Sequence, residues 1–434
     1  MLLIMPVVLA LVFSWYATRW YMGDFVAEFA PNMDEGQMEA AMAAMRLAPD
    51  DPWTHWVVAG LKRKSFLPED LQEAVHQYEE AARLSPNDYR FWLDLGRARE
   101  AAGDRDGGEK ALRRAVELAP SYAYPRWYLG NLLLRSGQID EAFAELRRAA
   151  EADARLRPGL FNSAWTLYSQ DVEQIRKVVG DSAAARGEFI SYLVGRQRMP
   201  DALNLWTTFT PAEKKEQSTI GNGLAQSLIE QKHYHTAWGI LREIGPDDGS
   251  TRTTQFVNGG FESDIDTAKT SLLNWRVKSD TQAQIAIDGS MRHGGERSLR
   301  ILFRSSQAMP FDNVSQLVVV EPATQYRFEC YVRAEDLKSG GTPLIYITDA
   351  MDGTTSLGSS EPLPAGTYDW QLVSINFKTS PKTEAVTVTI GRSMCGGAAV
   401  CPIFGKVWYD DFNLQSAGGT VSPRDAASGN KTRG

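Results

Sequence analysis

The sequence predicts a multidomain α-then-β protein, in which a helical α-solenoid precedes an antiparallel β-sandwich. Three observations predict this fold class. Glycine and proline recur with a period of 34 residues, from Gly96 to Gly130 and from Pro86 to Pro120. Apolar residues keep a helical spacing over residues 24–244 and then alternate along residues 255–415. A turn-rich segment, residues 245–254, separates the two patterns and is expected to be a linker.

Bulk composition limits the function classes. A chain of 434 residues is expected to form two or three units rather than one core. The net charge of −8 argues against a nucleic-acid partner, because no basic face dominates. Three cysteines exclude a disulfide-dense scaffold. Cys395 and Cys401 are predicted to form a disulfide if the compartment oxidises, with two free thiols as the alternative, whereas Cys330 is expected to be a buried apolar residue.

The N-terminal segment, residues 1–22, is predicted to be a transmembrane anchor. Residues 1–18 carry no charged side chain and would extend about 27 Å as a helix, close to the thickness of the hydrocarbon core. Interfacial residues are expected at Trp15, Tyr16, Arg19, Trp20 and Tyr21. A cleaved signal peptide and a soluble amphipathic helix are the alternatives. The expected location is therefore a single pass through the inner membrane, with the bulk of the chain on the periplasmic side.

The helical region contains a repeated unit between Trp56 and Ala149. A proline ends each second helix because it cannot donate the next backbone hydrogen bond, and a glycine allows the two helices of a pair to approach. The repeated positions are Trp56, Gly60, Ala74, Tyr78, Ala81 and Pro86; Trp92, Leu95, Gly96, Leu112, Ala115 and Pro120; then Leu129, Gly130, Ala142, Leu146 and Ala149. This pattern resembles the tetratricopeptide repeat family, with departures at Gly108 and Arg126. Weaker helical patterns extend the solenoid to Ile244.

The repeat resemblance implies a protein partner. In this family the first helix of each pair lines a groove that holds a segment of another protein. Carried over by position, the groove residues would be Arg90, Leu93, Arg97, Tyr124, Trp127, Asn131 and Arg135. The alternative for Trp127 is packing between helices. The family's carboxylate-clamp set of lysines and asparagines is not reproduced.

The alternating region resembles the jelly-roll carbohydrate-binding modules attached to bacterial polysaccharide-degrading enzymes. The resemblance spans the domain, from the first strand at residues 256–262, through Trp275, Tyr326, Phe328 and Trp370, to the last strand at residues 407–412. It implies a structural calcium between the first and last strands, on Glu262 and Asp411, with Asp410 a weaker ligand. The alternative is that these acids end strands and face water. Residues 416–434 lack apolar periodicity and are expected to be a disordered tail.

One face of the sandwich is a candidate glycan surface. Trp275, Trp370 and Trp408 are expected to point into the core, because apolar residues alternate with them. The opposite register offers Arg300, Arg304, Arg327, Glu329, Tyr331 and Arg333, and Tyr346 fits either set. An aromatic ring among arginines suits an acidic or phosphorylated glycan, whereas the alternative is a solvated sheet face.

No catalytic residue and no cofactor other than calcium is predicted. None of the five histidines belongs to a metal signature, and no nucleophile elbow or phosphate-binding loop is present. Asp349 and Asp352 are expected to lie in a surface turn. The sequence therefore predicts a non-catalytic, membrane-anchored adaptor whose groove binds a protein and whose jelly roll contacts a glycan, in the assembly or export of a surface polysaccharide. A protein-interaction scaffold without sugar binding is the main alternative, and a divergent glycoside hydrolase or lyase is the other.

Overall fold

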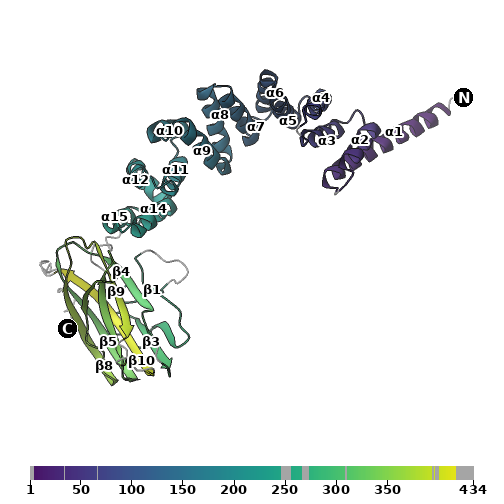
Figure 1. Cartoon of the computed structure of the whole chain (residues 1–434). Helices are drawn as coiled ribbons and strands as arrows, with labels where there is room; N and C mark the ends of the chain where they lie inside the picture. The colour runs from purple at the N-terminus through teal and green to yellow at the C-terminus, as the bar shows by residue number, and fades with distance from the viewer. Residues whose placement is uncertain are drawn as a thin grey trace, which may run out of the picture. The chain divides into compact units, whose positions relative to one another are not determined.

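The computed structural model describes residues 4–33, 35–65, 67–245, 256–265, 273–307, 310–392, 395 and 400–416. The chain forms two compact units, residues 1–207 and 208–434 (Figure 1). A helical region precedes two antiparallel sheets, which confirms the predicted fold class. The predicted linker, apart from Gly245, and the predicted tail, apart from Ser416, lie outside the described residues.

The first unit is made of helices, and most of them form antiparallel pairs. Aspartates cap α3, α5 and α6: Asp51, Asp88 and Asp104 each accept a hydrogen bond from a backbone N–H in the first turn. The helices of this unit are α1 (Ile4–Phe29), α2 (Gln37–Leu47), α3 (Pro52–Arg63), α4 (Pro68–Leu84), α5 (Tyr89–Ala101), α6 (Arg105–Leu118), α7 (Ala123–Arg135), α8 (Ile139–Ala152), α9 (Arg157–Leu167), α10 (Val172–Val179), α11 (Ala183–Gly195) and α12 (Met199–Thr207).

The repeat glycines mark the closest approach of two helices. A Cβ on Gly96 would lie 2.6 Å from Leu112 Cγ, and a Cβ on Gly130 would lie 2.7 Å from Leu146 Cγ. Both distances are too short for a side chain, so glycine is required at the same position in each repeat. Gly108, a departure from the repeat pattern, faces the Gly96 carbonyl and brings the backbones of α5 and α6 still closer.

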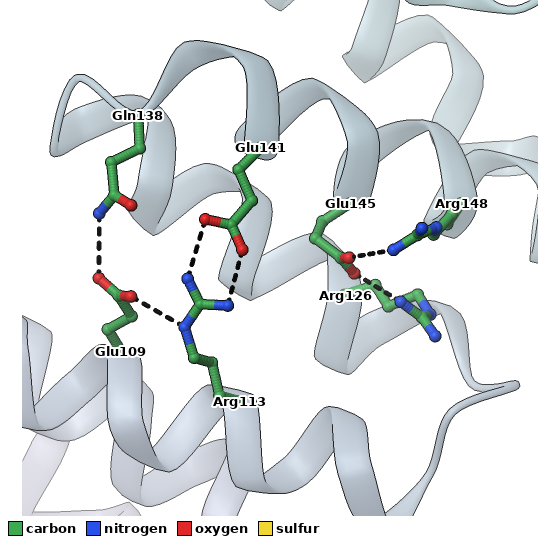
Figure 2. A network of polar contacts seen from close by, with 7 residues as sticks. All are labelled: Glu109, Arg113, Arg126, Gln138, Glu141, Glu145 and Arg148. Carbon is green, nitrogen blue, oxygen red and sulfur yellow. Dashed lines mark hydrogen bonds and ion pairs between the residues drawn. The ribbon is translucent and has the colours of Figure 1, made fainter.

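Arg126 takes over the role of the aromatic residue that the pattern expects. Its Nε donates to the carbonyl of Pro120 at 3.0 Å, and Trp92 Nε1 makes the equivalent bond to Pro86 at 2.9 Å. The Arg126 guanidinium also pairs with Glu145 at 2.6 Å, where both side chains are mostly buried. Figure 2 shows that Glu145 accepts from Arg148 as well, and that Glu109, Arg113, Gln138 and Glu141 form a second network between α6 and α8. Ion pairs therefore tie successive repeats together.

The predicted transmembrane anchor is wrong: no helix within the described residues combines the length and apolarity that a membrane crossing needs. The predicted single pass through the inner membrane is therefore not supported. Two of the five predicted interfacial residues contact other parts of the chain. Tyr16 Oη donates to Asp50 at 2.9 Å and Arg19 donates to the carbonyl of Arg46 at 2.5 Å.

The second unit contains the sandwich. One sheet has the order β1-β4-β9-β6-β7 and the other has the order β2-β3-β10-β5-β8, so that from β2 onward the chain repeatedly crosses between the sheets. Side chains from both inner faces, with Trp275 and Phe328 among the largest, form one continuous apolar core. The strands are β1 (Arg276–Val277), β2 (Ala283–Asp288), β3 (Ser298–Ser305), β4 (Val314–Val319), β5 (Gln325–Ser339), β6 (Pro343–Asp349), β7 (Ser356–Ser359), β8 (Gly366–Lys378), β9 (Ala385–Arg392) and β10 (Ile403–Ser416).

Three helices belong to the second unit: α13 (Pro211–Glu216), α14 (Ser218–Glu230) and α15 (Tyr234–Ile244). Tyr234 and Trp238 of α15 pack into an apolar cluster with Val319 of β4 and Ala385 of β9. Tyr234 Oη also donates to the carbonyl of Ala350 at 2.9 Å. The last helix is thus fixed to the first sheet and covers part of its outer face.

Substituting Gly130 by alanine tests the close helix contact. We expect Gly130→Ala to destabilise the first unit by about 1–3 kcal/mol, because the new methyl group overlaps Leu146. Gly195→Ala is the control: nothing lies within 4 Å of its Cβ position, so helix propensity predicts a neutral to slightly stabilising effect. Urea unfolding followed by circular dichroism measures both, and equal midpoints for the two variants would contradict the assignment.

Candidate functional site

The outer face of the sheet β2-β3-β10-β5-β8, called here the sheet face, carries most of the predicted glycan residues. On β5 the buried residues Phe328, Cys330 and Val332 alternate with Glu329, Tyr331 and Arg333, which point outward. Arg327 on β5 and Arg300 and Arg304 on β3 share this outward register. Tyr346 does not join them. It lies on β6 of the other sheet, where its ring covers Gly391.

Most arginines of the sheet face are neutralised by carboxylates. Arg300 pairs with Asp288 at 3.4 Å, Arg327 with Glu329 at 2.7 Å and Arg333 with Asp369 at 2.5 Å. In each pair the carboxylate balances a positive charge that would otherwise attract an acidic glycan. The structure therefore gives little support to the acidic ligand that the arginines alone suggested.

The three predicted core tryptophans have different environments. Trp275 lies in the core as expected. Trp408 is 2% exposed, but it belongs to the sheet face, where its Nε1 donates to Asp288 at 2.9 Å. Burial opposes ionisation of Asp288, but hydrogen bonds from Ser290 and Trp408 outweigh it and hold the pKa of Asp288 below its usual value. Trp370 is half-buried, with its ring centre 5.8 Å from that of His293 on the sheet face. Trp408 is therefore buried as predicted, although outside the core between the sheets, whereas the core prediction is wrong for Trp370.

His293 organises the centre of the sheet face. The loop between β2 and β3 places its ring flat against Tyr331, with the ring centres 3.5 Å apart and the planes at 13°. His293 Nδ1 lies 2.7 Å from Asp411 Oδ2, and its backbone N–H donates to Asp410 at 2.8 Å. Asp410 is fully buried, and this burial raises its pKa. No local sequence pattern indicates this role for His293, because its partners are more than 30 residues away in the chain.

A hollow of about 400 Å³ adjoins Tyr331. The hollow is lined by two carboxylates, one amide, three aromatic rings and two glycines. These residues are Phe256, Gly259, Gly260, Glu329, Tyr331, Asp411, Phe412 and Asn413. A flat aromatic ring beside hydrogen-bonding groups is the combination that a hydroxylated ring ligand requires. None of the hollow's aspartate, asparagine or glycine residues was among the predicted glycan contacts.

The predicted calcium ligands lie close together, but their carboxylates already accept hydrogen bonds from within the protein. The Glu262 carboxylate accepts the backbone N–H of Glu296 at 2.9 Å, and Asp410 accepts those of His293 and Gly294. Oxygen ligands of this kind suit calcium. In the part of the chain that the structure describes, however, no three histidine, cysteine or acidic side chains are grouped to hold a metal ion. Calcium on Glu262 and Asp411 stays a prediction.

The two remaining sets of predicted residues have structural roles. Cys395 and Cys401 are joined by a disulfide, and Cys330 is a buried free thiol. Asp352 lies in the predicted turn and accepts two of its backbone N–H groups, whereas Asp349 is buried at the end of β6 and accepts the Thr383 hydroxyl at 2.5 Å, so the surface position predicted for Asp349 is wrong.

The predicted groove residues follow one face of α5 and α7. Several are held by contacts within the array: Arg90 pairs with Asp88, Arg97 with Asp94, and Arg135 of α7 with Glu100 of α5. Leu93 is packed against an apolar cluster, and Asn131 donates to the Trp127 carbonyl.

Tyr124 and Trp127 differ in their exposure to solvent. Tyr124 is 49% exposed. Trp127 is partly buried, and a Cβ on Gly159 of α9 would lie only 2.7 Å from its ring. Its contact with the next repeat matches the alternative that Trp127 packs between helices.

Comparison with known proteins supports both halves of the fold. Residues 253–392 match a family described as a carbohydrate binding domain, and residues 69–123 and 93–156 match the tetratricopeptide repeat family. The N-terminal half therefore holds tetratricopeptide repeats, and the C-terminal region holds a domain of the carbohydrate-binding type. Both types are typically non-catalytic.

Individual relatives are distant. Superkiller protein 3 of Saccharomyces cerevisiae is 25% identical over 109 residues, which cover 24% of this chain and 8% of that protein. YrrB, a tetratricopeptide repeat protein with an unusual peptide-binding site, is 16% identical and covers 42% of this chain and 86% of its own, with a TM-score of 0.30. Carbohydrate-binding and catalytic modules of a Clostridium thermocellum xylanase, complexed with xylohexaose, are 12% identical and cover 38% of this chain and 29% of theirs, with a TM-score of 0.26.

The two aspartates that pair with arginines on the sheet face are expected to differ in energetic weight. Asp288→Ala leaves the buried Trp408 Nε1–H without its partner, so we expect a loss of about 2–3 kcal/mol. Asp369 is 80% exposed, so Asp369→Ala is expected to cost less than about 1 kcal/mol. Denaturant unfolding followed by tryptophan fluorescence compares them. A similar cost for both would show that the Asp288–Trp408 bond does not support the sheet face.

Proposed function

We propose that this protein is a non-catalytic adaptor, whose repeats bind a segment of a partner protein and whose sandwich binds a glycan on the sheet face around Tyr331. The glycan-binding half is supported by the family match over residues 253–392 and by one observation in particular. Tyr331 is clamped on one side by His293 and lines the polar hollow.

The clamp on Tyr331 matters because it removes conformational freedom before a ligand arrives. An aromatic ring that is already fixed loses no further side-chain entropy when a sugar ring stacks on it. Glu329 and Asn413 lie in the same hollow and can accept or donate hydrogen bonds to sugar hydroxyls. Because the neighbouring arginines are paired, we propose a neutral or weakly charged polysaccharide rather than a strongly acidic one.

The outer face of the other sheet is less suited to a long polymer. Helix α15 covers Val319 and Ala385 there. Tyr346 nevertheless lies flat over Gly391 beside Thr389, so it is the second place where a sugar ring would stack. An adaptor of this kind would suit the assembly or export of a surface polysaccharide, which remains part of the proposal.

The second candidate function is a protein-interaction scaffold whose sandwich binds no sugar. The ion-paired arginines favour it, because paired charges are also typical of a solvated sheet face. Glycan binding by the whole protein separates the two candidates.

Affinity electrophoresis in gels that contain xylan, mixed-linkage β-glucan, alginate or chitosan tests the glycan half. We expect retardation of the wild-type protein in at least one gel and an approximately tenfold weaker affinity for Tyr331→Ala, which removes the stacking ring. Tyr346→Ala is the matched control and is expected to behave as the wild type. Retardation lost only in Tyr346→Ala would move the site to the other sheet, and no retardation in any gel or in further bacterial polysaccharides would favour the scaffold.

Site-specific photocrosslinking tests the protein half. A photoreactive phenylalanine analogue in place of Tyr124, which lies exposed on the first helix α7, is expected to form one discrete adduct with a partner. The same analogue in place of Arg114, exposed on the second helix α6, is expected to form none. Equal adducts from both positions would contradict a partner on the first-helix face.

A further inference from the structure

Arg196 belongs to the minority of arginines in the helical region for which the described residues supply no carboxylate partner. Most arginines of this region pair with a carboxylate, as Arg157 does with Glu188 and Arg198 does with Asp201. Within the residues that the structure describes, Arg196 has no carboxylate within 4 Å, although it is exposed at the C-terminal end of α11. An exposed guanidinium without a carboxylate partner is available to pair with a carboxylate of a ligand.

The guanidinium of Arg196 is held in place by uncharged groups. One nitrogen donates to Asn162 Oδ1 at 3.0 Å, and the group lies over the rings of Tyr192 and Trp165, at 5.1 and 5.7 Å from their centres. Tyr192 Oη donates to the same Asn162 oxygen at 3.0 Å. Two donors therefore fix the Asn162 amide, and four of the five guanidinium N–H groups remain for a ligand.

Asn162, which holds the guanidinium, also lines a hollow of about 430 Å³ on the first-helix face. Leu134 of α7 and Leu167 of α9 give the hollow an apolar wall, and Leu167 is 44% exposed. The hydroxyls of Ser163 and Thr166 already donate to backbone carbonyls of α9, so they require no ligand. Asn162, which forms one wall, has its Nδ2 donors free of any bond within the described residues.

We propose that this site, made by α7, α9 and α11, binds an acidic segment of the partner protein: a leucine-sized apolar side chain enters the hollow, and a neighbouring aspartate or glutamate pairs with Arg196. This inference rests on the proposed protein-binding function and gives the chemistry of the bound segment. A carboxylate fits better than a phosphate, because phosphate sites usually gather several arginines and the nearby Arg198 is already paired with Asp201. The planar guanidinium matches a carboxylate with two parallel hydrogen bonds.

Fluorescence polarisation with the full chain tests the proposal. The probes are two short fluorescein-labelled peptides that alternate leucine with glutamate in one and with glutamine in the other. We expect the glutamate peptide to bind wild-type protein about tenfold more tightly, and this preference to shrink as salt is raised from about 50 to 500 mM. Arg196→Gln is expected to abolish the preference.

Two further variants make the test specific to this arginine. Asn162→Asp places a carboxylate against Arg196 and is expected to abolish the preference without removing the arginine. Arg155→Gln is the matched control, because Arg155 is exposed and already paired with Asp153, so the preference is expected to survive. Circular dichroism confirms that each variant is folded.

The remaining outcomes overturn the proposal. A preference that survives in Arg196→Gln, or equal binding of both peptides by the wild type, contradicts an acidic partner segment. In the second case the repeats still bind peptides, so the proposed function stands while this inference fails. Binding of neither peptide also overturns the inference, and the crosslinking experiment then decides on the proposed function by itself.

Discussion

The β-bulge at Asp410 and Asp411 is the constraint on which the candidate glycan site depends. It breaks the pairing of β10 with β5 between Asp410 and Asn413 and puts Asp411 at a φ of 51°, outside the conformation of a regular strand. The bulge directs Asp410 to two backbone N–H groups of the β2–β3 loop and leaves the N–H of Phe412 free to bond to the Gly259 carbonyl at 3.0 Å. The segment around Gly259, the β2–β3 loop and the strand β10 thereby meet beside Tyr331. Without the bulge, His293 would have no support and Tyr331 would be one more exposed side chain on a sheet.

Charge balance explains why the two candidate sites stand out from the rest of the surface. Both the repeats and the sandwich carry many arginines, and most of them meet a carboxylate on the same or the neighbouring element. Such pairs contribute little to stability when exposed, but they leave no single-sign patch to attract a ligand. The hollow beside Tyr331 and the hollow beside Arg196 are the exceptions: the first joins an immobilised ring to polar groups, and the second joins an immobilised cation to an apolar wall. Each has its recognition group fixed before binding, which lowers the entropic cost of association.

The sequence predicted the architecture because its signals are local. The glycine and proline period follows from one close contact per helix pair, and strand alternation follows from one buried face. Contacts between distant segments escaped prediction. The prediction for Trp370 is wrong because the pairing of β5 with β8 shifts register between Tyr368 and Gln371, which changes the alternation at Trp370. The N-terminal segment matches a membrane span because residues 1–18 carry no charge and aromatic residues follow them, but the contact of Tyr16 with Asp50 is not visible in such a local pattern. The docking of α15 on Val319 and the stacking of His293 on Tyr331 join residues more than 30 positions apart, and no spacing rule reports such contacts.

Hydrogen–deuterium exchange of the full chain, with and without a polysaccharide that retards it in a gel, tests the central claim most directly. The bulge-centred site predicts slower exchange in three segments that are separate in sequence, residues 256–262, 289–297 and 411–415, because a ligand in the hollow would hold all three together. Exchange in β6 and β9, around Tyr346, should not change. Slower exchange in β6 and β9 with none in the three segments would contradict the account and place the ligand on the opposite sheet.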